Sequence, residues 1–271
     1  MIKLTIKAFT TQSDHTQDIS LSYEHFGLPL DQAPVVLVNH ALTGNSNVAG
    51  ADGWWSALIG PDKCIDTNRY AVLAFNIPGN GYDGFVIDAY KQFVAKDMAQ
   101  LFLLGLEALG VSKLYAIIGG SLGGGIAWEM AALNPDITSH LIPVASDWKS
   151  TDWLIANCQI QEQFLLNSKQ PVHDARMHAM LCYRTPESFN QRFNRSTNEA
   201  LQVFNVESWL THHGEKLQSR FQLSAYKLVN QLLRSIDITK NGPEAFRKLQ
   251  ESDTHIHIIG VDSDLFFTAS D

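Results

Sequence analysis

The sequence contains little that would indicate a nucleic-acid-binding, membrane-embedded or disulfide-bonded protein. Its 271 residues carry a formal net charge of −8 and no cluster of Lys or Arg, which argues against a nucleic-acid partner. No apolar run approaches the length of a membrane span, and the first residues alternate like a strand and lack the apolar core of a signal peptide. The three cysteines, Cys64, Cys158 and Cys182, form no CxxC pair and indicate free thiols in a reducing compartment. We therefore expect a cytoplasmic protein that contacts neither membrane nor nucleic acid.

Metal-ligand spacings and internal repeats are also absent from the sequence. No cluster of His, Cys and Asp has the spacing of a metal site, so we expect no bound metal. The composition itself is ordinary, with 45% hydrophobic and 18% charged residues. A chain of this length and composition can bury a sizeable core, as one large domain or as a domain with an insertion.

Strand-like patterns alternate with helix-like segments along the chain. Two half-buried strands, which we expect to be antiparallel, are predicted at 2–9 and 19–26. Continuous apolar runs predict further strands, buried on both faces, at 34–40, 70–76, 114–118, 140–145 and 255–261. Helix-like segments separate several of these runs, notably at 90–109 and 125–133. The alternation predicts an α/β fold with a mostly parallel sheet.

The character of the sequence changes between about Asp147 and Asp237. This stretch is rich in Gln, Asn, Leu, Arg and His and has helical spacing throughout. It predicts a helical insertion between two strands of the sheet, in the position of a lid over an active site. The predicted organisation is therefore a first part of the core at 1–146, a lid at 147–237 and a second part of the core at 238–271.

The most informative motif is Gly-Gly-Ser-Leu-Gly at 119–123. It follows the apolar run 114–118 and precedes a helix-like segment, which is the context of a G-x-S-x-G nucleophile elbow. In such an elbow the serine lies on a strained strand-to-helix turn, and glycines allow the backbone to close around it. The motif predicts that Ser121 is a nucleophile in acyl chemistry.

Two further components are expected around such a serine. In α/β-hydrolase order the acid follows the nucleophile, and Asp262 and Asp264, after the run 255–261, are both candidates. The N–H of Leu122 is one candidate donor to an oxyanion hole, and the N–H of Leu42, in the loop after an early strand, is the other.

Several polar residues have structural explanations from the sequence alone. We interpret His40 as a residue that orients its loop rather than as a catalytic base. His255 and His257 lie on one face of a predicted strand and are interpreted as core or near-core residues. His212 and His213 belong to the insertion and fit a surface position.

Arg176 and Tyr183 are seven residues apart in a helical pattern and share one face. Alone they indicate a solvated helix face with one interfacial tyrosine.

Taken together, the motifs resemble those of the homoserine O-acyltransferases of the α/β-hydrolase superfamily, most closely the homoserine O-acetyltransferases. The matching stretches extend from the early loop to the end of the chain. They are Asn-His-Ala-Leu-Thr-Gly at 39–44, Gly-Trp-Trp at 53–55, Leu-Ile-Gly-Pro at 58–61, Asp-Thr at 66–67, Gly-Gly-Ser-Leu-Gly-Gly at 119–124, Ala-Arg-Met at 175–177, Tyr-Arg at 183–184, Arg-Phe at 192–193, Gly-Glu-Lys at 214–216, Arg-Phe at 220–221 and Ser-Asp-Leu-Phe at 263–266.

The resemblance implies a ping-pong acyl transfer in methionine biosynthesis. Ser121 would take an acetyl group from acetyl-CoA, which acts as a substrate rather than a bound cofactor, and pass it to the hydroxyl of homoserine. The resemblance assigns the triad acid to Asp264 and the oxyanion donors to Leu42 and Leu122. It also implies that Arg176 and Tyr183 bind substrate, with Arg176 at the homoserine carboxylate, and that the protein is a homodimer paired through its lid helices.

The chain departs from the family pattern in two places. The glycine-rich segment after the strand at 70–76 is shortened to 77–84. The triad histidine of the family follows the aspartate, whereas residues 265–271 contain no histidine. We therefore expect a chain truncated at its C-terminal end, without the last strand and helix of the fold. Loss of the base from a triad costs on the order of 10⁶ in turnover in subtilisin, so the chain as printed is expected to be nearly inactive.

Three hypotheses follow. The first is an acyltransferase given as a fragment, and it is favoured because Arg176 and Tyr183 accompany the nucleophile. The second is an esterase that uses water as the acceptor. The third is a catalytically silent relative that keeps the fold.

Overall fold

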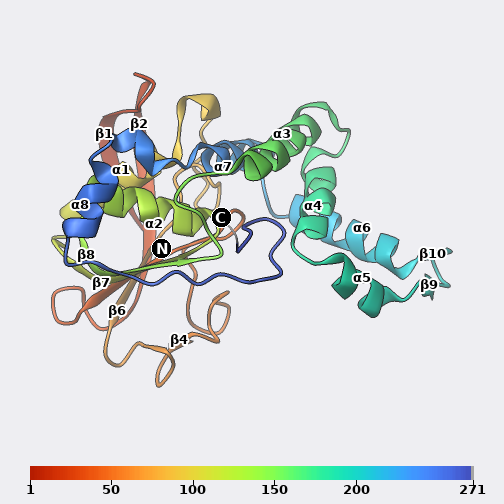
Figure 1. The fold of residues 1–271 in the computed structure, drawn as a ribbon, viewed down its shortest axis with the longest axis horizontal. Helices are drawn as coiled ribbons and strands as arrows, with labels where there is room; N and C mark the ends of the chain where they lie inside the picture. Colours follow the sequence, from red (N-terminus) through yellow and green to blue (C-terminus); the bar gives the residue numbers. More distant parts are fainter. Residues whose placement is uncertain (270–271) are drawn as a thin grey trace.

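The centre of the computed structural model, which describes residues 1–269, is a seven-stranded sheet (Figure 1). Its strands, in spatial order, are β1 (Ile2–Thr10), β2 (Thr16–Gly27), β6 (Ala71–Phe75), β3 (Val35–Asn39), β7 (Leu114–Gly120), β8 (Thr138–Val144) and β11 (His255–Ile256). The β1–β2 and β2–β6 pairs are antiparallel, and the remaining neighbours are parallel. Two small ladders lie apart from this sheet, β4 (Ile59–Gly60) with β5 (Ile65–Asp66) and β9 (Thr197–Asn198) with β10 (Val203–Phe204).

The burial of each strand explains its place in the sheet. Every residue of β3 and β6 is buried, which matches their continuous apolar sequences and the presence of protein on both faces. β1, in contrast, alternates in burial and lies at the edge. The predicted α/β-hydrolase class with a mostly parallel sheet is confirmed.

Eight α-helices and two short 3₁₀ helices are present in the part of the chain that the structure describes. They are α1 (Ala95–Ala108), α2 (Leu122–Leu133), α3 (Asp152–Asn167), α4 (Pro171–Cys182), α5 (Pro186–Phe193), α6 (Asn205–Gln218), α7 (Leu223–Ser235) and α8 (Ala245–Glu251), with η1 (Tyr90–Gln92) and η2 (Ile238–Asn241). Helices α1, α2 and α7 contribute buried residues to the main core against one face of the sheet. A smaller apolar cluster on the other face includes residues of the loop that carries β4 and β5.

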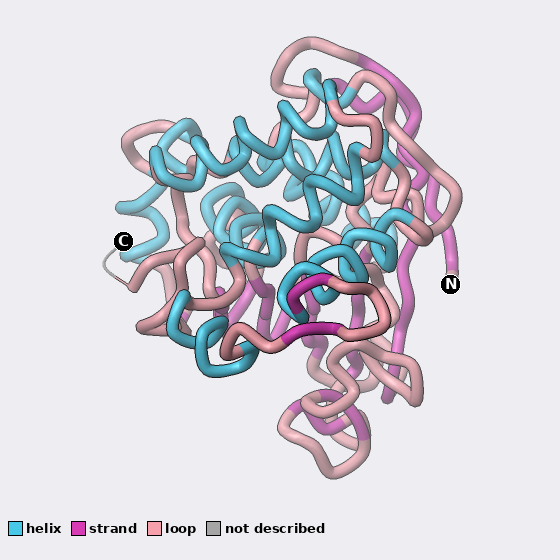
Figure 2. Tube along the Cα trace, turned by 90° about the vertical axis from the view of Figure 1, so that its right-hand side faces the viewer, coloured by secondary structure: helices cyan, strands magenta, loops and turns pink. Residues whose placement is uncertain are grey.

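The helices α3 to α6 extend away from the sheet on one side (Figure 1). Figure 2, turned so that this end faces the viewer, shows helices in front of the strands. We refer to α3–α6 with the β9–β10 ladder as the lid. Helix α7, although it lies inside the predicted insertion at 147–237, contacts α1 and α2 of the core, so the boundaries of the insertion stay a prediction.

The predicted strand at 255–261 is wrong in its length. Only His255–Ile256 form strand β11, followed by a single bridge from Ile259 to Val144. The side chains of Ile258 and Ile259 are 68% and 49% exposed, so the apolar run lacks the packing that would have stabilised a longer strand.

The histidines of this segment also differ from expectation. His255 and His257 are exposed rather than core residues, and His257 Nε2 lies 3.1 Å from Nδ1 of His140 on β8. The sequence pattern predicted buried side chains here, and that prediction is wrong.

The helix at 90–109 is divided, because the carboxylate of Asp97 accepts the N–H of Val94 and caps α1 at that point. No helix within residues 1–269 has the length and apolar character that a membrane crossing requires.

Candidate active site

Ser121 occupies a strained turn between β7 and α2. Its backbone angles are φ 53° and ψ −124°, a region that L-residues rarely adopt. Its N–H donates to the carbonyl of Val144 on β8 (2.9 Å), and its carbonyl accepts from Gly124 N–H (2.9 Å). These hydrogen bonds hold the serine at the carboxyl end of the parallel strands, at the first turn of a helix.

The glycines around Ser121 are required by close approach of the backbone. A Cβ on Gly119 would lie 2.3 Å from the carbonyl oxygen of Gly123, and a Cβ on Gly123 would lie 2.3 Å from that of Asn39 on β3. At Gly120 the nearest atom would be 3.9 Å away. Gly119 and Gly123 are therefore required by the close approach of β7, α2 and β3. Gly120, which occupies the first variable position of G-x-S-x-G, is not required for this reason.

Ser121 and Asp264 line the same cavity, whose volume is about 420 Å³. The other walls come from the end of β8, the α4–α5 connection of the lid and the loop that follows β11. The lining includes Ala145, Cys182, Tyr183, Arg184, Thr185, Ser188, Val261, Ser263, Leu265, Phe266 and Phe267. Asp262, the other acid candidate, is not among the lining residues.

The carboxylate of Asp264 is oriented by its own loop, which we call the acid loop (residues 262–267). One oxygen accepts the backbone N–H groups of Phe266 (2.7 Å) and Phe267 (3.0 Å). The lid holds this loop from outside, because Nε1 of Trp153, at the start of α3, donates to the carbonyl of Leu265 (2.6 Å).

The loop after β3 carries Leu42 in a turn at residues 41–44, which we call the oxyanion loop. The carbonyl of Ala41 accepts both the N–H of Gly44 (2.9 Å) and Nδ1–H of His40 (2.8 Å). Because the C=O and N–H of a trans peptide point in opposite directions, fixing this carbonyl also fixes the N–H of Leu42. Leu122 supplies a second N–H from the first turn of α2, where no intrahelical acceptor exists.

His40 cannot act as the base in this arrangement. Its Nε2 accepts from the N–H of Ile77 (3.0 Å) and from Nδ2 of Asn80 (3.3 Å), while Nδ1 donates to Ala41. Burial lowers the pKa of His40 to about 4, so the ring is neutral at physiological pH and both nitrogens are used. The interpretation that His40 orients its loop is confirmed.

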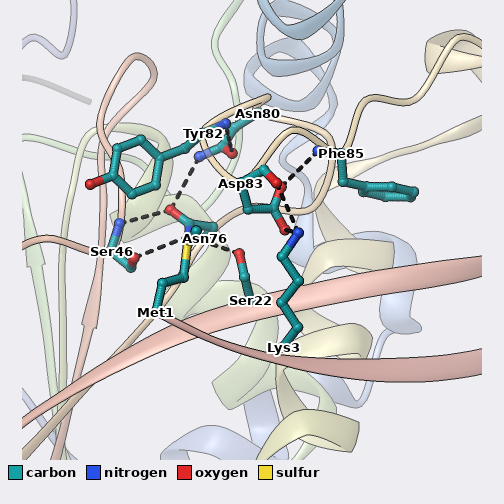
Figure 3. A network of polar contacts seen from close by, with 9 residues as sticks. All are labelled: Met1, Lys3, Ser22, Ser46, Asn76, Asn80, Tyr82, Asp83 and Phe85. Carbon is teal, nitrogen blue, oxygen red and sulfur yellow. Dashed lines mark hydrogen bonds and ion pairs between the residues drawn. The ribbon is translucent and has the colours of Figure 1, made fainter.

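A polar network around Asn76 reaches the first strands of the sheet, and Figure 3 shows Asn76 with Ser46 and Ser22. The side chain of Asn76, just after β6, accepts the N–H of Ser46 (2.8 Å) and donates to the hydroxyls of Ser46 (3.0 Å) and Ser22 (2.8 Å). The hydroxyl of Ser46 donates to Glu24 on β2 (2.5 Å). The segment just after the oxyanion loop is thus tied to strands far away in the sequence.

The predicted substrate-binding pair lies on the lid. The guanidinium carbon of Arg176, on α4, is 5.3 Å from the ring centre of Tyr183, which follows that helix and lines the cavity. The ring of Tyr183 also contacts Phe266 of the acid loop, with ring centres 6.0 Å apart. Their roles, like those of Ser121, Asp264, Leu42 and Leu122, stay predictions; the geometry places Tyr183 with the serine and the aspartate.

No histidine lines the Ser121 cavity within residues 1–269. His178, on α4, is bonded through Nδ1 to Gln161 (2.8 Å). Two residues of the site were not predicted. Arg184 belongs to a motif of the resemblance and could have been found there, whereas nothing in the local sequence indicates the contact of Trp153 with the acid loop.

Comparisons with known proteins agree with this geometry. A family model described as the alpha/beta hydrolase fold matches residues 34–207. The chain is 31% identical to a homoserine O-acetyltransferase of Trichormus variabilis, over 86% of this chain and 71% of that protein. The crystal structure of a homoserine O-acetyltransferase from Staphylococcus aureus superposes with a TM-score of 0.85 at 26% identity, over 100% of this chain and 82% of that one. The chain belongs to the homoserine O-acetyltransferase family.

The chain spans only part of the length of the relatives that it matches. A homoserine O-acetyltransferase of Methanococcus vannielii is 32% identical over 93% of this chain, and the match spans 59% of that protein.

Proposed function

We propose that the protein transfers an acetyl group from acetyl-CoA to the side-chain hydroxyl of homoserine through an acyl-Ser121 intermediate. The observation that carries the proposal is the strained elbow of Ser121, which opens with Asp264 into a cavity walled by the lid. The names of the relatives support acetyl transfer to homoserine.

The proposed chemistry has two half-reactions. In the first, the Ser121 hydroxyl attacks the thioester carbonyl, its proton passes to a base, and the N–H groups of Leu42 and Leu122 stabilise the oxyanion. The C–S bond then breaks, and the thiol leaves with that proton. In the second, the homoserine hydroxyl attacks the acyl-serine, loses its proton to the base, and O-acetylhomoserine leaves as the proton returns to the serine.

The base in this scheme is a histidine that Asp264 orients. The family pattern predicts it after Asp264, and residues 265–271 do not supply it. Arg176 is proposed to bind the homoserine carboxylate as a fixed fork, with Tyr183 beside it.

We further propose that the protein is a cytoplasmic homodimer paired through its lid helices. Ile155, Ile160 and Leu166 of α3 support this proposal, because they are 38%, 45% and 49% exposed on one helix. Light scattering of the purified protein tests it, and a monomer at micromolar concentration would contradict it.

The decisive experiment uses the protein as its complete gene encodes it, incubated with acetyl-CoA and homoserine. We expect O-acetylhomoserine and free CoA in equal amounts, and an acetyl adduct on Ser121 when homoserine is omitted. Ser121→Ala should abolish both. CoA release at the same rate without homoserine would favour the esterase, and no adduct under any condition would overturn the covalent mechanism.

A further inference from the structure

A second cavity lies within the lid. Its volume is about 1100 Å³, and its walls come from α5, α6 and the β9–β10 ladder. Arg192, Phe193, Trp209 and His212 are among its lining residues. The proposed acyl transfer assigns no role to this space.

A stack of two arginines and a tryptophan connects the two cavities. Arg184 lines the Ser121 cavity, and its guanidinium carbon lies 5.7 Å from the ring centre of Trp209 on α6. The guanidinium carbon of Arg192 lies 5.6 Å from the same ring, and both Arg192 and Trp209 line the second cavity. The contact between Arg184 and Trp209 therefore joins the lining of one cavity to that of the other.

The charges of the two arginines are not neutralised within residues 1–269. Neither Arg184 nor Arg192 forms an ion pair with a described carboxylate. One nearby carboxylate, that of Glu207, is occupied by the N–H of Phe204 at the start of α6 (2.7 Å). Glu215 also lines the second cavity.

Other basic residues lie near the same helix. His213 packs on Trp209 with ring centres 4.3 Å apart, and its pKa is lowered by burial and by the charges of Arg176 and Arg184, among other basic neighbours. The guanidinium groups of Arg184 and Arg192 form no ion pair with a described carboxylate, although Glu207 and Glu215 line the second cavity, and two such groups on one ring are suited to binding a multiply charged anion.

We propose that Arg184, Arg192 and Trp209 bind the phosphate-bearing nucleotide end of a coenzyme-thioester acyl donor. The proposal rests on the proposed function, because it assumes a donor whose thioester reaches Ser121 while its phosphates stay outside. A guanidinium that stacks on a ring keeps its N–H donors in its own plane, where they can reach phosphate oxygens. The indole of Trp209 offers an apolar surface between the two charges.

The experiment compares the binding of coenzyme A with that of pantetheine, which has the same thiol arm and no phosphate. Isothermal titration of the complete protein should give an affinity for coenzyme A at least about tenfold higher than for pantetheine, since charge-assisted hydrogen bonds are the strong ones. The double variant Arg184→Gln, Arg192→Gln should lose most of this difference. Raising the salt concentration should weaken coenzyme A binding alone.

Arg195→Gln is the matched control. Arg195 is on the same lid and lies over the ring of Phe204 (5.5 Å), but it lines neither of the two cavities. Its substitution should leave coenzyme A affinity unchanged. Equal losses in the control and in the double variant would overturn the proposal, as would equal affinities for coenzyme A and pantetheine.

The outcome is separable from that of the proposed function. Coenzyme A binding that depends on the two arginines, without any acetylation of Ser121, would support the nucleotide site and contradict acyl transfer. Acetylation of Ser121 by acetyl-pantetheine as efficiently as by acetyl-CoA would support the serine chemistry and overturn the nucleotide site.

Discussion

The two loops that flank Ser121 are held in different ways. The oxyanion loop lies next to a buried network, in which His40 and Asn76 tie it to β6 and, through Ser22, to β2. The acid loop follows a strand of two residues and is held from outside, by the hydrogen bond of Trp153 and the ring contact of Tyr183. One side of the site belongs to the core, and the other depends on the lid.

This difference indicates that the oxyanion loop and the acid loop have different mechanical properties. Hydrogen bonds in a buried network with all polar atoms partnered strongly favour one geometry, which suits donors that must be in place before the oxyanion forms. A loop held by half-exposed groups opens at lower free energy. Because Tyr183 of the lid both contacts the acid loop and lines the cavity, movement of the lid is expected to move Asp264 relative to Ser121.

The largest expected effect comes from a substitution at Gly119, just before the turn that carries Ser121, on the side of the site that belongs to the core. In Gly119→Ala the new Cβ would lie 2.3 Å from the Gly123 carbonyl, a backbone atom that cannot move without displacing the elbow. We expect a loss of more than about 3 kcal/mol in the free energy of unfolding, measured by urea denaturation.

Gly120→Ala is the control for this substitution, because its Cβ would meet nothing closer than 3.9 Å and its φ is not positive. It should change stability by less than about 1 kcal/mol. Similar losses in the two variants would show that the elbow is not defined by the close contact at Gly119.

The second prediction concerns His40 and pH. Its pKa is about 4 in the folded protein, against an ordinary value of 6.5, so the unfolded state binds a proton that the folded state does not. The stability from this group is therefore fully present above pH 6.5 and is lost as the pH falls from 6.5 toward 4, by about 3 kcal/mol in total.

The comparison variant is His40→Gln, whose amide oxygen can still accept the Ile77 N–H but does not titrate. The difference in unfolding free energy between the wild type and this variant should decrease between pH 7 and pH 4.5. A difference that stays constant over this range would contradict the neutral, buried state of His40.

The sequence predicted the core side of the site better than the lid side. The runs at 34–40 and 114–118 became β3 and β7 because continuous apolar sequence and burial on both faces have the same cause. Ser121 was found because its glycines follow from local backbone geometry. The extent of β11 could not be predicted, since its apolar run lacks a packing partner, and packing is not visible in the local pattern.

The contacts across the site were also beyond local patterns. Trp153 and Leu265 are 112 residues apart, and no periodicity relates them. The network of Asn76, Ser46 and Ser22 depends on which strands become neighbours in the sheet. Such contacts are set by the order of the strands and the position of the lid, both of which are properties of the whole fold.

The smallest expected effect comes from Trp153→Phe, which removes a hydrogen bond to the acid loop. The ring is kept but the donor to the Leu265 carbonyl is lost, which should cost about 1 kcal/mol locally. Amide hydrogen exchange in residues 262–268 should become roughly fivefold faster, while exchange in the oxyanion loop stays unchanged. Trp54→Phe is the matched control, since its Nε1 makes the same kind of bond to the Asn45 carbonyl (2.9 Å) beside the oxyanion loop. If Trp153→Phe accelerated exchange in both loops equally, the two sides would form one cooperative unit, and the division between a core-held and a lid-held half of the site would be wrong.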